Sequence, residues 1–208
     1  MNYLGHFYLA AQTKTSFVGA LLGDFVKGHA WQSHTQSEQI GILLHRQLDS
    51  WIDQWVIDEQ LTALFPGEQR RYAPIALDLY WDYQLACSWP TCSSLSLSEF
   101  SQSVYLQLTQ SPLPHSAAHV AHQMIEYDWL NRYEKRVFIQ NALAHISQRI
   151  RRPMPVAALC CSLQTHHDHL SQKFTQLIDA LHHYAPLWHT AARHSVQAVQ
   201  SRPSFDDN

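Results

Sequence analysis

Hydrophobic residues recur at intervals of three and four along most of this chain, which is the spacing that puts them on one face of an α-helix. The clearest case is a helix predicted over residues 39–64. Its apolar face consists of Ile40, Leu43, Leu44, Leu48, Trp51, Ile52 and Trp55. The sequence Phe65-Pro66-Gly67 predicts its end, because proline and glycine terminate helices. Glycine is scarce, and we expect few strands or none.

The same spacing predicts further helices, separated by breaks that contain proline. We expect them over residues 70–89, 98–108, 116–130, 139–150 and 156–189, the last stretch forming one long helix or two, with Pro186 near its end. Pro74 would lie in the first turn of its helix, where the missing N–H is tolerated. The chain is therefore predicted to be all-α: a single-domain helical bundle over residues 1–195, followed by a disordered tail over residues 196–208.

The composition supports a folded, soluble protein. Hydrophobic residues make up 46% of the 208 positions and charged residues 15%, which is typical of a globular core and not of a disordered chain. The net charge of −3 does not favour nucleic acid as a partner. Apolar runs are much shorter than the roughly 20 residues that span a membrane, and no secretory signal is visible, so we expect a cytoplasmic protein. The four cysteines form no Cys-x-x-Cys pair, and we expect them to be reduced packing residues.

One predicted helix carries a polar stripe that could bind a metal ion. His45, Asp49 and Asp53 are spaced by four residues and therefore share one helix face. The alternative is a solvated face on which Asp49 and Asp53 pair with basic neighbours. Spacing alone does not decide between these two readings.

A second pair of carboxylates, Asp78 and Asp82, is also spaced by four residues. Apolar side chains surround the pair: Ile75, Leu77, Leu79, Tyr80, Trp81 and Leu85. Buried carboxylates need a cation, which here would be a metal ion or an arginine such as Arg70 or Arg71. A structural salt bridge is the alternative to a metal site.

Asp24 is a third candidate, because it interrupts an apolar run and is followed by Lys27 and Gly28. Asp24 could be a metal ligand and Lys27 could contact phosphate, although an ordinary helix end with an ion pair fits as well. Combined, the three segments offer one histidine and up to five carboxylates, a set that suits Mn²⁺ or Mg²⁺. Such an ion would polarise a phosphoryl group and lower the pKa of a bound water, so we expect hydrolysis of a phosphate ester.

Taken in order, several segments resemble the acyl carrier protein phosphodiesterases. They are Asn2-Tyr3-Leu4-Gly5-His6, Leu21-Leu22-Gly23-Asp24-Phe25-Val26-Lys27-Gly28, His45-Arg46 with Asp49 and Asp53, Arg70-Arg71-Tyr72-Ala73-Pro74-Ile75, Leu77-Asp78 and Trp81-Asp82. The resemblance implies an all-helical fold distantly related to HD-type phosphohydrolases, and dependence on manganese, with magnesium also possible. It further implies hydrolysis of the phosphodiester between a carrier-protein serine and 4'-phosphopantetheine, which converts holo-acyl carrier protein to the apo form.

The resemblance also implies a set of site residues. The metal ligands would be Asp24, His45, Asp49, Asp78 and Asp82, with His6 as a weaker addition. Catalysis would fall to Asp24, His45, Asp82 and Lys27. Phosphate contacts would come from Lys27, Arg46 and Arg70. Since acyl carrier proteins are acidic, we expect a basic docking rim of Lys14, Lys27, Arg46, Arg70 and Arg71.

The chain departs from the family pattern at Tyr83. Relatives commonly follow the preceding aspartate with His-Phe-Leu, whereas this chain has Tyr83-Gln84-Leu85. The departure would weaken activity or move the role of that histidine to His6 or His45. Two alternatives to the phosphodiesterase reading remain: a noncatalytic helical module that binds carrier protein or a pantetheine-bearing ligand, and a phosphohydrolase of small nucleotides.

Overall fold

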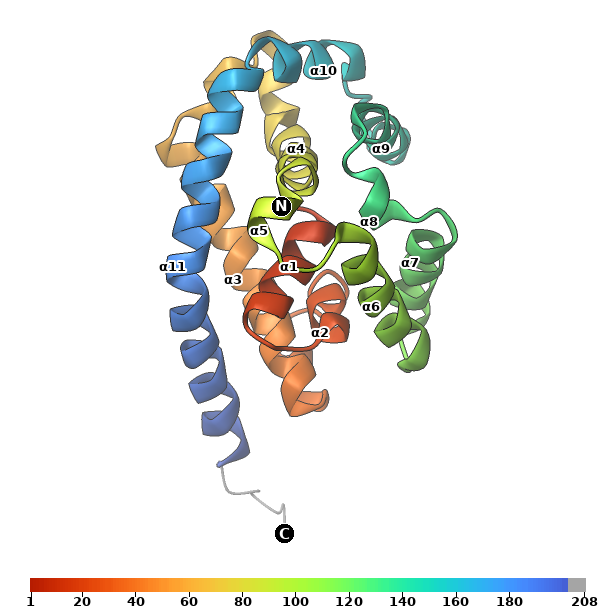
Figure 1. Ribbon diagram of the computed structural model, residues 1–208, viewed down its shortest axis with the longest axis vertical. Helices are drawn as coiled ribbons and strands as arrows, with labels where there is room; N and C mark the ends of the chain where they lie inside the picture. Colours follow the sequence, from red (N-terminus) through yellow and green to blue (C-terminus); the bar gives the residue numbers. More distant parts are fainter. Residues whose placement is uncertain (202–208) are drawn as a thin grey trace.

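The computed structural model describes residues 1–201, and within this range the chain is built of helices with no strand (Figure 1). The predicted all-α class is confirmed. The α-helices are α1 (Tyr3–Gln12), α2 (Phe17–Leu22), α3 (Gln36–Asp58), α4 (Ala73–Cys87), α5 (Trp89–Cys92), α6 (Leu97–Gln110), α7 (His115–Glu126), α8 (Trp129–Arg132), α9 (Arg136–Arg149), α10 (Val156–Thr165) and α11 (His167–Gln200). Three short 3₁₀ helices are η1 (Ala30–Ser33), η2 (Leu61–Leu64) and η3 (Gly67–Tyr72).

Capping residues and backbone conformation set the limits of α3. The helix begins after Thr35, whose hydroxyl accepts from the Glu38 amide while the Glu38 carboxylate accepts from the Thr35 amide. It ends at Asp58, because Gln60 adopts a left-handed conformation with φ of 54°. The predicted end at residue 64 is therefore corrected, and residues 61–64 form the separate helix η2.

Two other predicted boundaries near prolines also need correction. The helix predicted from residue 70 begins at Ala73 with Pro74 in its first turn, and η3 occupies the preceding residues. The stretch over residues 156–189, expected as one long helix or two, consists of two helices that meet at His166. The second of these, α11, continues through Pro186 and does not end there.

The predicted disordered tail begins too early. Residues 196–200 belong to the last turns of α11, because Val196 is fully buried against the core and holds the helix in place. Residues 202–208, the rest of that predicted tail, lie outside the described residues. The cysteine prediction holds in part. All four cysteines are free, but Cys87 and Cys161 are exposed and do not pack in the core.

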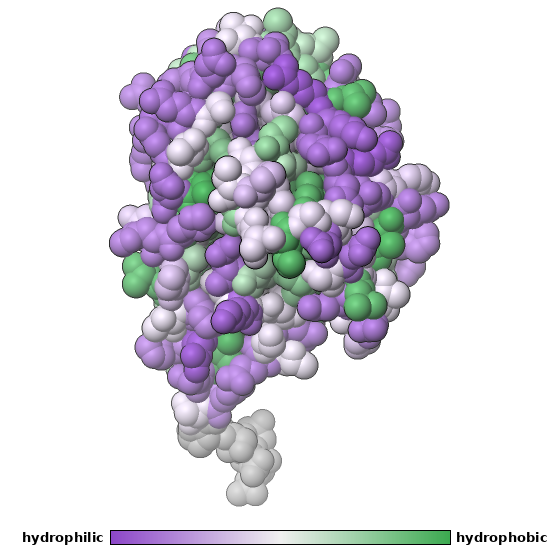
Figure 2. Space-filling model, in the orientation of Figure 1, coloured by the Kyte–Doolittle hydropathy of each residue, from purple (hydrophilic) through white to green (hydrophobic). Residues whose placement is uncertain are grey.

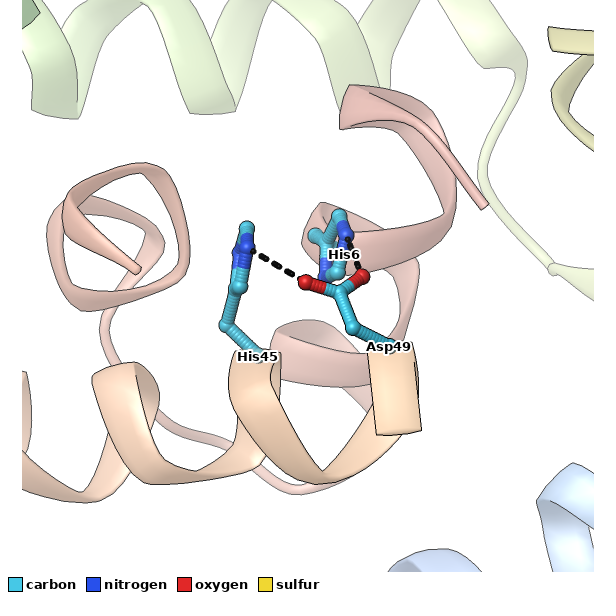
Figure 3. A group of neighbouring side chains, drawn as sticks. All are labelled: His6, His45 and Asp49. Atoms are coloured by element: carbon cyan, nitrogen blue, oxygen red, sulfur yellow. Dashed lines mark ion pairs between the residues drawn. The ribbon is translucent and has the colours of Figure 1, made fainter. Parts of the chain in front are cut away.

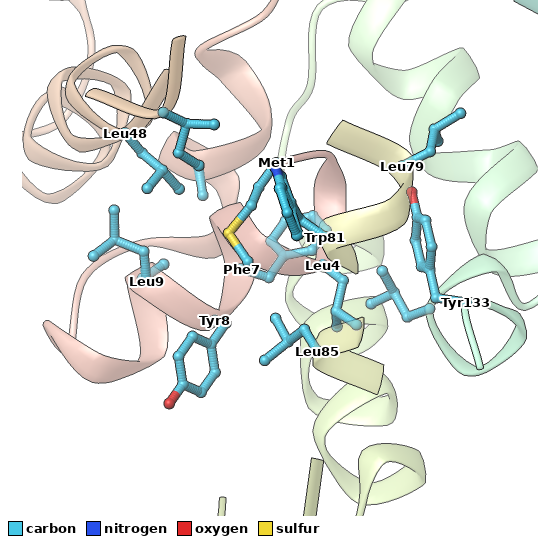
Figure 4. Packing of buried hydrophobic residues seen from close by; sticks show 14 of the residues in the cluster. Met1, Leu4, Phe7, Tyr8, Leu9, Leu48, Leu79, Trp81, Leu85 and Tyr133 are labelled. Atoms are coloured by element: carbon cyan, nitrogen blue, oxygen red, sulfur yellow. The ribbon is translucent and has the colours of Figure 1, made fainter. Parts of the chain in front are cut away.

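The first helix lies at the centre of the protein, between α3, α4 and the group formed by α2 and α6 (Figure 1). All residues of α1 from Leu4 to Ala10 are buried, as expected for a helix enclosed on every side. Leu4 and Phe7 lie beside Trp81 and Leu85 of α4 in the hydrophobic core (Figure 4). The α1 helix is therefore held rigidly, together with any functional side chain that it carries.

Helices α2 and α3 approach each other closely through two glycines. A Cβ atom added to Gly19 would lie 2.5 Å from the carbonyl oxygen of Glu38, and one added to Gly41 would lie 2.9 Å from the Cα of Gly19. Both separations are far below normal van der Waals contact, so this packing requires glycine at both positions. The close approach brings the end of α2, and Asp24 after it, beside the middle of α3.

One face of the molecule shows how polar and apolar residues are distributed over its surface. The face drawn in Figure 2 is largely hydrophilic, with only small, scattered apolar patches. None of the helices within residues 1–201 is both long and apolar enough to cross a membrane.

Candidate metal centre

Three side chains from two helices bring their polar atoms together in the middle of the protein. They are His6 of α1 and His45 and Asp49 of α3, and their potential ligand atoms all lie within 4.8 Å of one another (Figure 3). The Nε2 atom of His6 is 3.1 Å from one carboxylate oxygen of Asp49, and the Nε2 atom of His45 is 3.1 Å from the other. The Asp49 carboxylate thus bridges the Nε2 atoms of the two imidazole rings. In the described part of the chain this is the only such group of three or more potential metal ligands.

The His45 ring is fixed by contacts on the side opposite Asp49. Its Nδ1 atom lies 2.7 Å from the carbonyl oxygen of Ala20, which can only accept a hydrogen bond, so Nδ1 carries a proton. Nε2 then faces Asp49, either as a donor or, when neutral, with a lone pair free for a metal ion. The ring also fills the space beside Gly23, where a Cβ atom would lie 2.1 Å from the Cγ of His45.

The His6 ring stacks on the His45 ring. The ring centroids are 3.6 Å apart and the planes differ by 11°. The Nδ1 atom of His6 is buried without a hydrogen-bond partner among the described residues, so Nε2 provides the only polar contact of this ring. Both imidazoles therefore present the same nitrogen to the same carboxylate.

Asp24 approaches this group from the end of α2. Its carboxylate oxygen is 3.5 Å from the Nε2 of His45, and its side chain is 48% exposed. Asp24 and Asp49, with side chains 48% and 45% exposed, are thus the members of the centre that solvent reaches, whereas both histidines are buried. The structure brings together Asp24, His45 and Asp49 of the predicted ligand set, and with them His6, the weaker addition to that set.

Charges within the centre shift its pKa values in opposite directions. Burial, together with the charge of His45, lowers the pKa of His6 to about 4. Burial also opposes protonation of His45, but hydrogen bonds to Asp24 and Asp49 outweigh it and raise the pKa of His45 to about 9. The same bonds from His45 and His6 outweigh the effect of burial on Asp49 and lower the pKa of that carboxyl. Without a metal ion, the centre at neutral pH holds one cationic ring, one neutral ring and an ionised carboxylate.

Asp82 of α4 binds the beginning of α1. It is fully buried and accepts hydrogen bonds from the amides of Asn2, Leu4 and Gly5 at 3.1, 2.7 and 3.1 Å. Burial raises its pKa to about 7, although these donors and the terminal ammonium favour the charged form. The carboxylate satisfies amides in the first turn of α1, which no residue within the helix can do.

Asp78 also faces the start of α1. One of its carboxylate oxygens is 2.9 Å from the amino group of Met1. Both carboxylates thus bind the beginning of α1, and neither belongs to the group formed by His6, His45 and Asp49. Their predicted role as metal ligands stays a prediction. Asp53, one turn beyond Asp49, is exposed and has no ion pair within residues 1–201.

The predicted basic residues fall into two groups. Lys27 donates to the carbonyl oxygen of Asp24 at 2.7 Å and is exposed. Arg46 donates to the carbonyl oxygens of Gly28 and Val26 at 2.9 and 2.6 Å, which fixes the loop after α2. Arg70, Arg71 and Lys14 are exposed elsewhere. The two arginines lie in the last turn of η3, and the lysine follows α1.

The fold and this centre define the class of the protein: an all-helical protein with a candidate metal centre of two histidines and carboxylates, built mainly by its first and third helices. Comparison with known proteins gives the family. A family model described as acyl carrier protein phosphodiesterase matches residues 1–181. The chain belongs to the acyl carrier protein phosphodiesterase family.

Individual relatives agree with this assignment. The chain is 35% identical to the acyl carrier protein phosphodiesterase of Serratia proteamaculans and 34% identical to that of an Enterobacter species, and each match covers 85% of this chain and 93% of the relative. It is 29% identical to the protein of the same name from Yersinia enterocolitica, over 87% of this chain and 95% of the relative. No solved structure matches the chain. The predicted family and the predicted enzyme class, a phosphodiesterase, are confirmed, while the distant relation to HD-type phosphohydrolases stays a prediction.

Proposed function

We propose that this phosphodiesterase depends on a divalent metal ion and acts on holo-acyl carrier protein, releasing 4'-phosphopantetheine from the carrier serine. The single observation that carries the metal dependence is the convergence of His6, His45 and Asp49 within 4.8 Å. Two imidazole nitrogens with one or two carboxylates form a mixed donor set. Such a set suits Mn²⁺ better than Mg²⁺, which prefers oxygen ligands alone.

The residues in and around the centre have different roles in the proposed hydrolysis. His6, His45 and Asp49 would hold the ion, which when bound polarises the phosphoryl group and makes water more acidic. Asp24, an exposed carboxylate at the edge of the centre, is placed to orient the attacking water and accept its proton. Lys27 lies beside Asp24 and can offer its remaining N–H donors to the phosphate.

We assign Arg46 a positioning role in place of the predicted phosphate contact. Two of its guanidinium nitrogens are already bonded to the carbonyl oxygens of Gly28 and Val26, on either side of Lys27. Arg46 follows His45 directly in α3, so it ties the loop that carries Lys27 to the helix that carries the centre. Arg70, Arg71 and Lys14 remain available for docking the acidic carrier protein.

The substrate follows from the relatives, whose names specify acyl carrier protein. Purified holo-acyl carrier protein incubated with the chain and Mn²⁺ is expected to lose the mass of its phosphopantetheine group, and excess chelator is expected to stop the loss. The readout is mass spectrometry of the intact carrier protein. An unchanged mass with Mn²⁺, Mg²⁺ and Zn²⁺, together with a stable complex, would favour the noncatalytic binding module. Faster turnover of small nucleotide diesters would favour the nucleotide phosphohydrolase.

Metal binding should depend on pH in a defined direction. The pKa of His45 is about 9, so at pH 7 an incoming ion must displace its Nε2 proton, whereas His6, with a pKa of about 4, is already neutral. We therefore expect release of about one proton per Mn²⁺ at pH 7, and affinity that falls by about tenfold for each pH unit between pH 8 and pH 6. Calorimetry in buffers of different ionisation enthalpy measures the released proton. Affinity independent of pH over this range would contradict the assignment of His45 as a ligand.

A further inference from the structure

A second candidate site lies on the far side of α4 from the metal centre. Asp82 of α4 faces α1, whereas Tyr80 and Tyr83 line a cavity of about 50 Å³ that is completed by residues of α9, α10 and the start of α11. In Figure 1 these helices surround the upper part of the molecule, above α1. Neither the metal centre nor the proposed hydrolysis uses any residue of this cavity.

The walls of the cavity are mostly apolar. Ile139, Leu163 and Cys160 line it together with the ring of Tyr80. The Tyr80 hydroxyl is already occupied, since it lies 2.6 Å from Nδ1 of His167 and accepts from the Gln84 side chain at 2.7 Å. The interior therefore suits a hydrocarbon chain, because it has few free polar groups that need to be hydrated by water.

An anchored cation stands at the edge of these apolar walls. The Nε atom of Arg136 donates to the Tyr83 hydroxyl at 3.0 Å, and a second guanidinium nitrogen donates to the Gln164 side chain. The guanidinium also lies 5.8 Å from the centroid of the Tyr83 ring. Within residues 1–201, no carboxylate lies within ion-pair distance of Arg136. Its charge is held in place but is not neutralised, and its remaining N–H donors are available to a ligand.

We propose that this cavity binds a short-chain carboxylate, with the carboxylate on Arg136 and the alkyl chain among Ile139, Cys160 and Leu163. Arginine is well suited to a carboxylate because its planar N–H groups match the two oxygens. The cavity volume of about 50 Å³ is several times the roughly 10–15 Å³ that a cavity needs to hold one water molecule, which leaves room for roughly three to five chain atoms. The preferred ligand is therefore an acid of about four to six carbons.

The site depends on the residue at which this chain departs from the family pattern. Tyr83 provides the hydroxyl and the ring that hold Arg136, and a histidine at that position lacks the phenol oxygen. The proposal is independent of the proposed hydrolysis, because the cavity and the metal centre share no residue.

Adjacent cysteines provide an internal test. Cys160 lines the cavity, whereas Cys161, the next residue, is exposed and lies outside the lining. Burial raises the pKa of the Cys160 thiol, so alkylation with iodoacetamide is run at mildly alkaline pH and followed by tandem mass spectrometry. With hexanoate at ten times its dissociation constant, determined by calorimetry, Cys160 is expected to react about tenfold more slowly while the rate at Cys161 stays the same.

Variants and ligand analogues test whether binding in the cavity causes the protection of Cys160 by hexanoate. Arg136→Gln, at an exposed position, is expected to remove the protection by hexanoate, and Arg132→Gln, which changes an exposed arginine outside the cavity, is expected to keep it. Leu163→Phe should also remove protection by filling the cavity, with circular dichroism confirming the fold. Hexanol and acetate should protect Cys160 poorly, because hexanol lacks the carboxylate and acetate lacks the alkyl chain. The proposal is overturned by an absence of hexanoate binding, by equal slowing at both cysteines, by full protection in Arg136→Gln, or by affinity that rises steadily up to decanoate.

Discussion

Replacing Asp49 by asparagine is expected to reduce metal-dependent hydrolysis of holo-acyl carrier protein by far more than a hundredfold. Loss of a residue that only supports a metal ligand typically costs 10- to 100-fold, and Asp49 is placed as a ligand itself. Its two carboxylate oxygens each lie 3.1 Å from a histidine Nε2, so asparagine would keep the shape but replace one oxygen by an amino group. The rate is measured by mass spectrometry of the carrier protein over time, and the bound Mn²⁺ by calorimetry.

The matched control for this variant is Asp53→Asn. Asp53 lies one turn further along the same face of α3, is exposed, and forms no ion pair within the described part of the chain. The control is expected to retain full activity and full metal binding. Since the Asp49 side chain is 45% exposed, the fold of Asp49→Asn should also persist, which circular dichroism can verify. Normal turnover by Asp49→Asn would refute the assignment of the centre.

Replacing Asp82 by alanine is expected to lower the free energy of unfolding by about 3–5 kcal/mol, because three amides of α1 lose their acceptor in a fully buried place. Urea unfolding measures the change. Asp58→Ala, which removes an exposed carboxylate at the end of α3, should change stability by less than about 0.5 kcal/mol.

A second variant at this position, Asp82→Asn, distinguishes a role in holding α1 from a role as a metal ligand. Asp82→Asn keeps one oxygen acceptor and is expected to be less destabilised than alanine, while binding Mn²⁺ with unchanged stoichiometry. Unchanged stability combined with loss of the metal ion would show that Asp82 is a ligand, contrary to the structure. Because the pair of variants differs mainly in the number of acceptors, the comparison remains informative even if the alanine variant folds poorly.

The sequence was sufficient to predict the part of the centre that lies on a single helix. His45 and Asp49 are one turn apart on α3, so their proximity follows from helical geometry alone. Asp78 and Asp82 have the same spacing, and they do share a face of α4. Spacing does not reveal what lies opposite that face, and here it is the first turn of α1 with its unpaired amides.

His6 was a weaker prediction for the same reason. It has no partner within α1, and its contacts with His45 and Asp49 exist only because α1 and α3 pack together in the core. Helix limits were misjudged because apolar spacing does not show whether the backbone stays helical. Leu61 remains buried after Gln60 has turned left-handed, and Val196 is buried well beyond Pro186. Burial therefore persisted across both points, and only the backbone conformation distinguished one long helix from two segments.

Because Gly23 contacts His45, the residue at this one position indicates whether a member of the family can form the metal centre. Any side chain at position 23 would occupy the space of the His45 ring, with its Cβ 2.1 Å from Cγ, and would turn that ring away from Asp49. A relative that retains every proposed metal ligand but carries a larger residue here should therefore have a displaced ring and a weakened centre. Inspection of this one glycine can warn that a family member has changed its chemistry, even when the ligand residues themselves look intact.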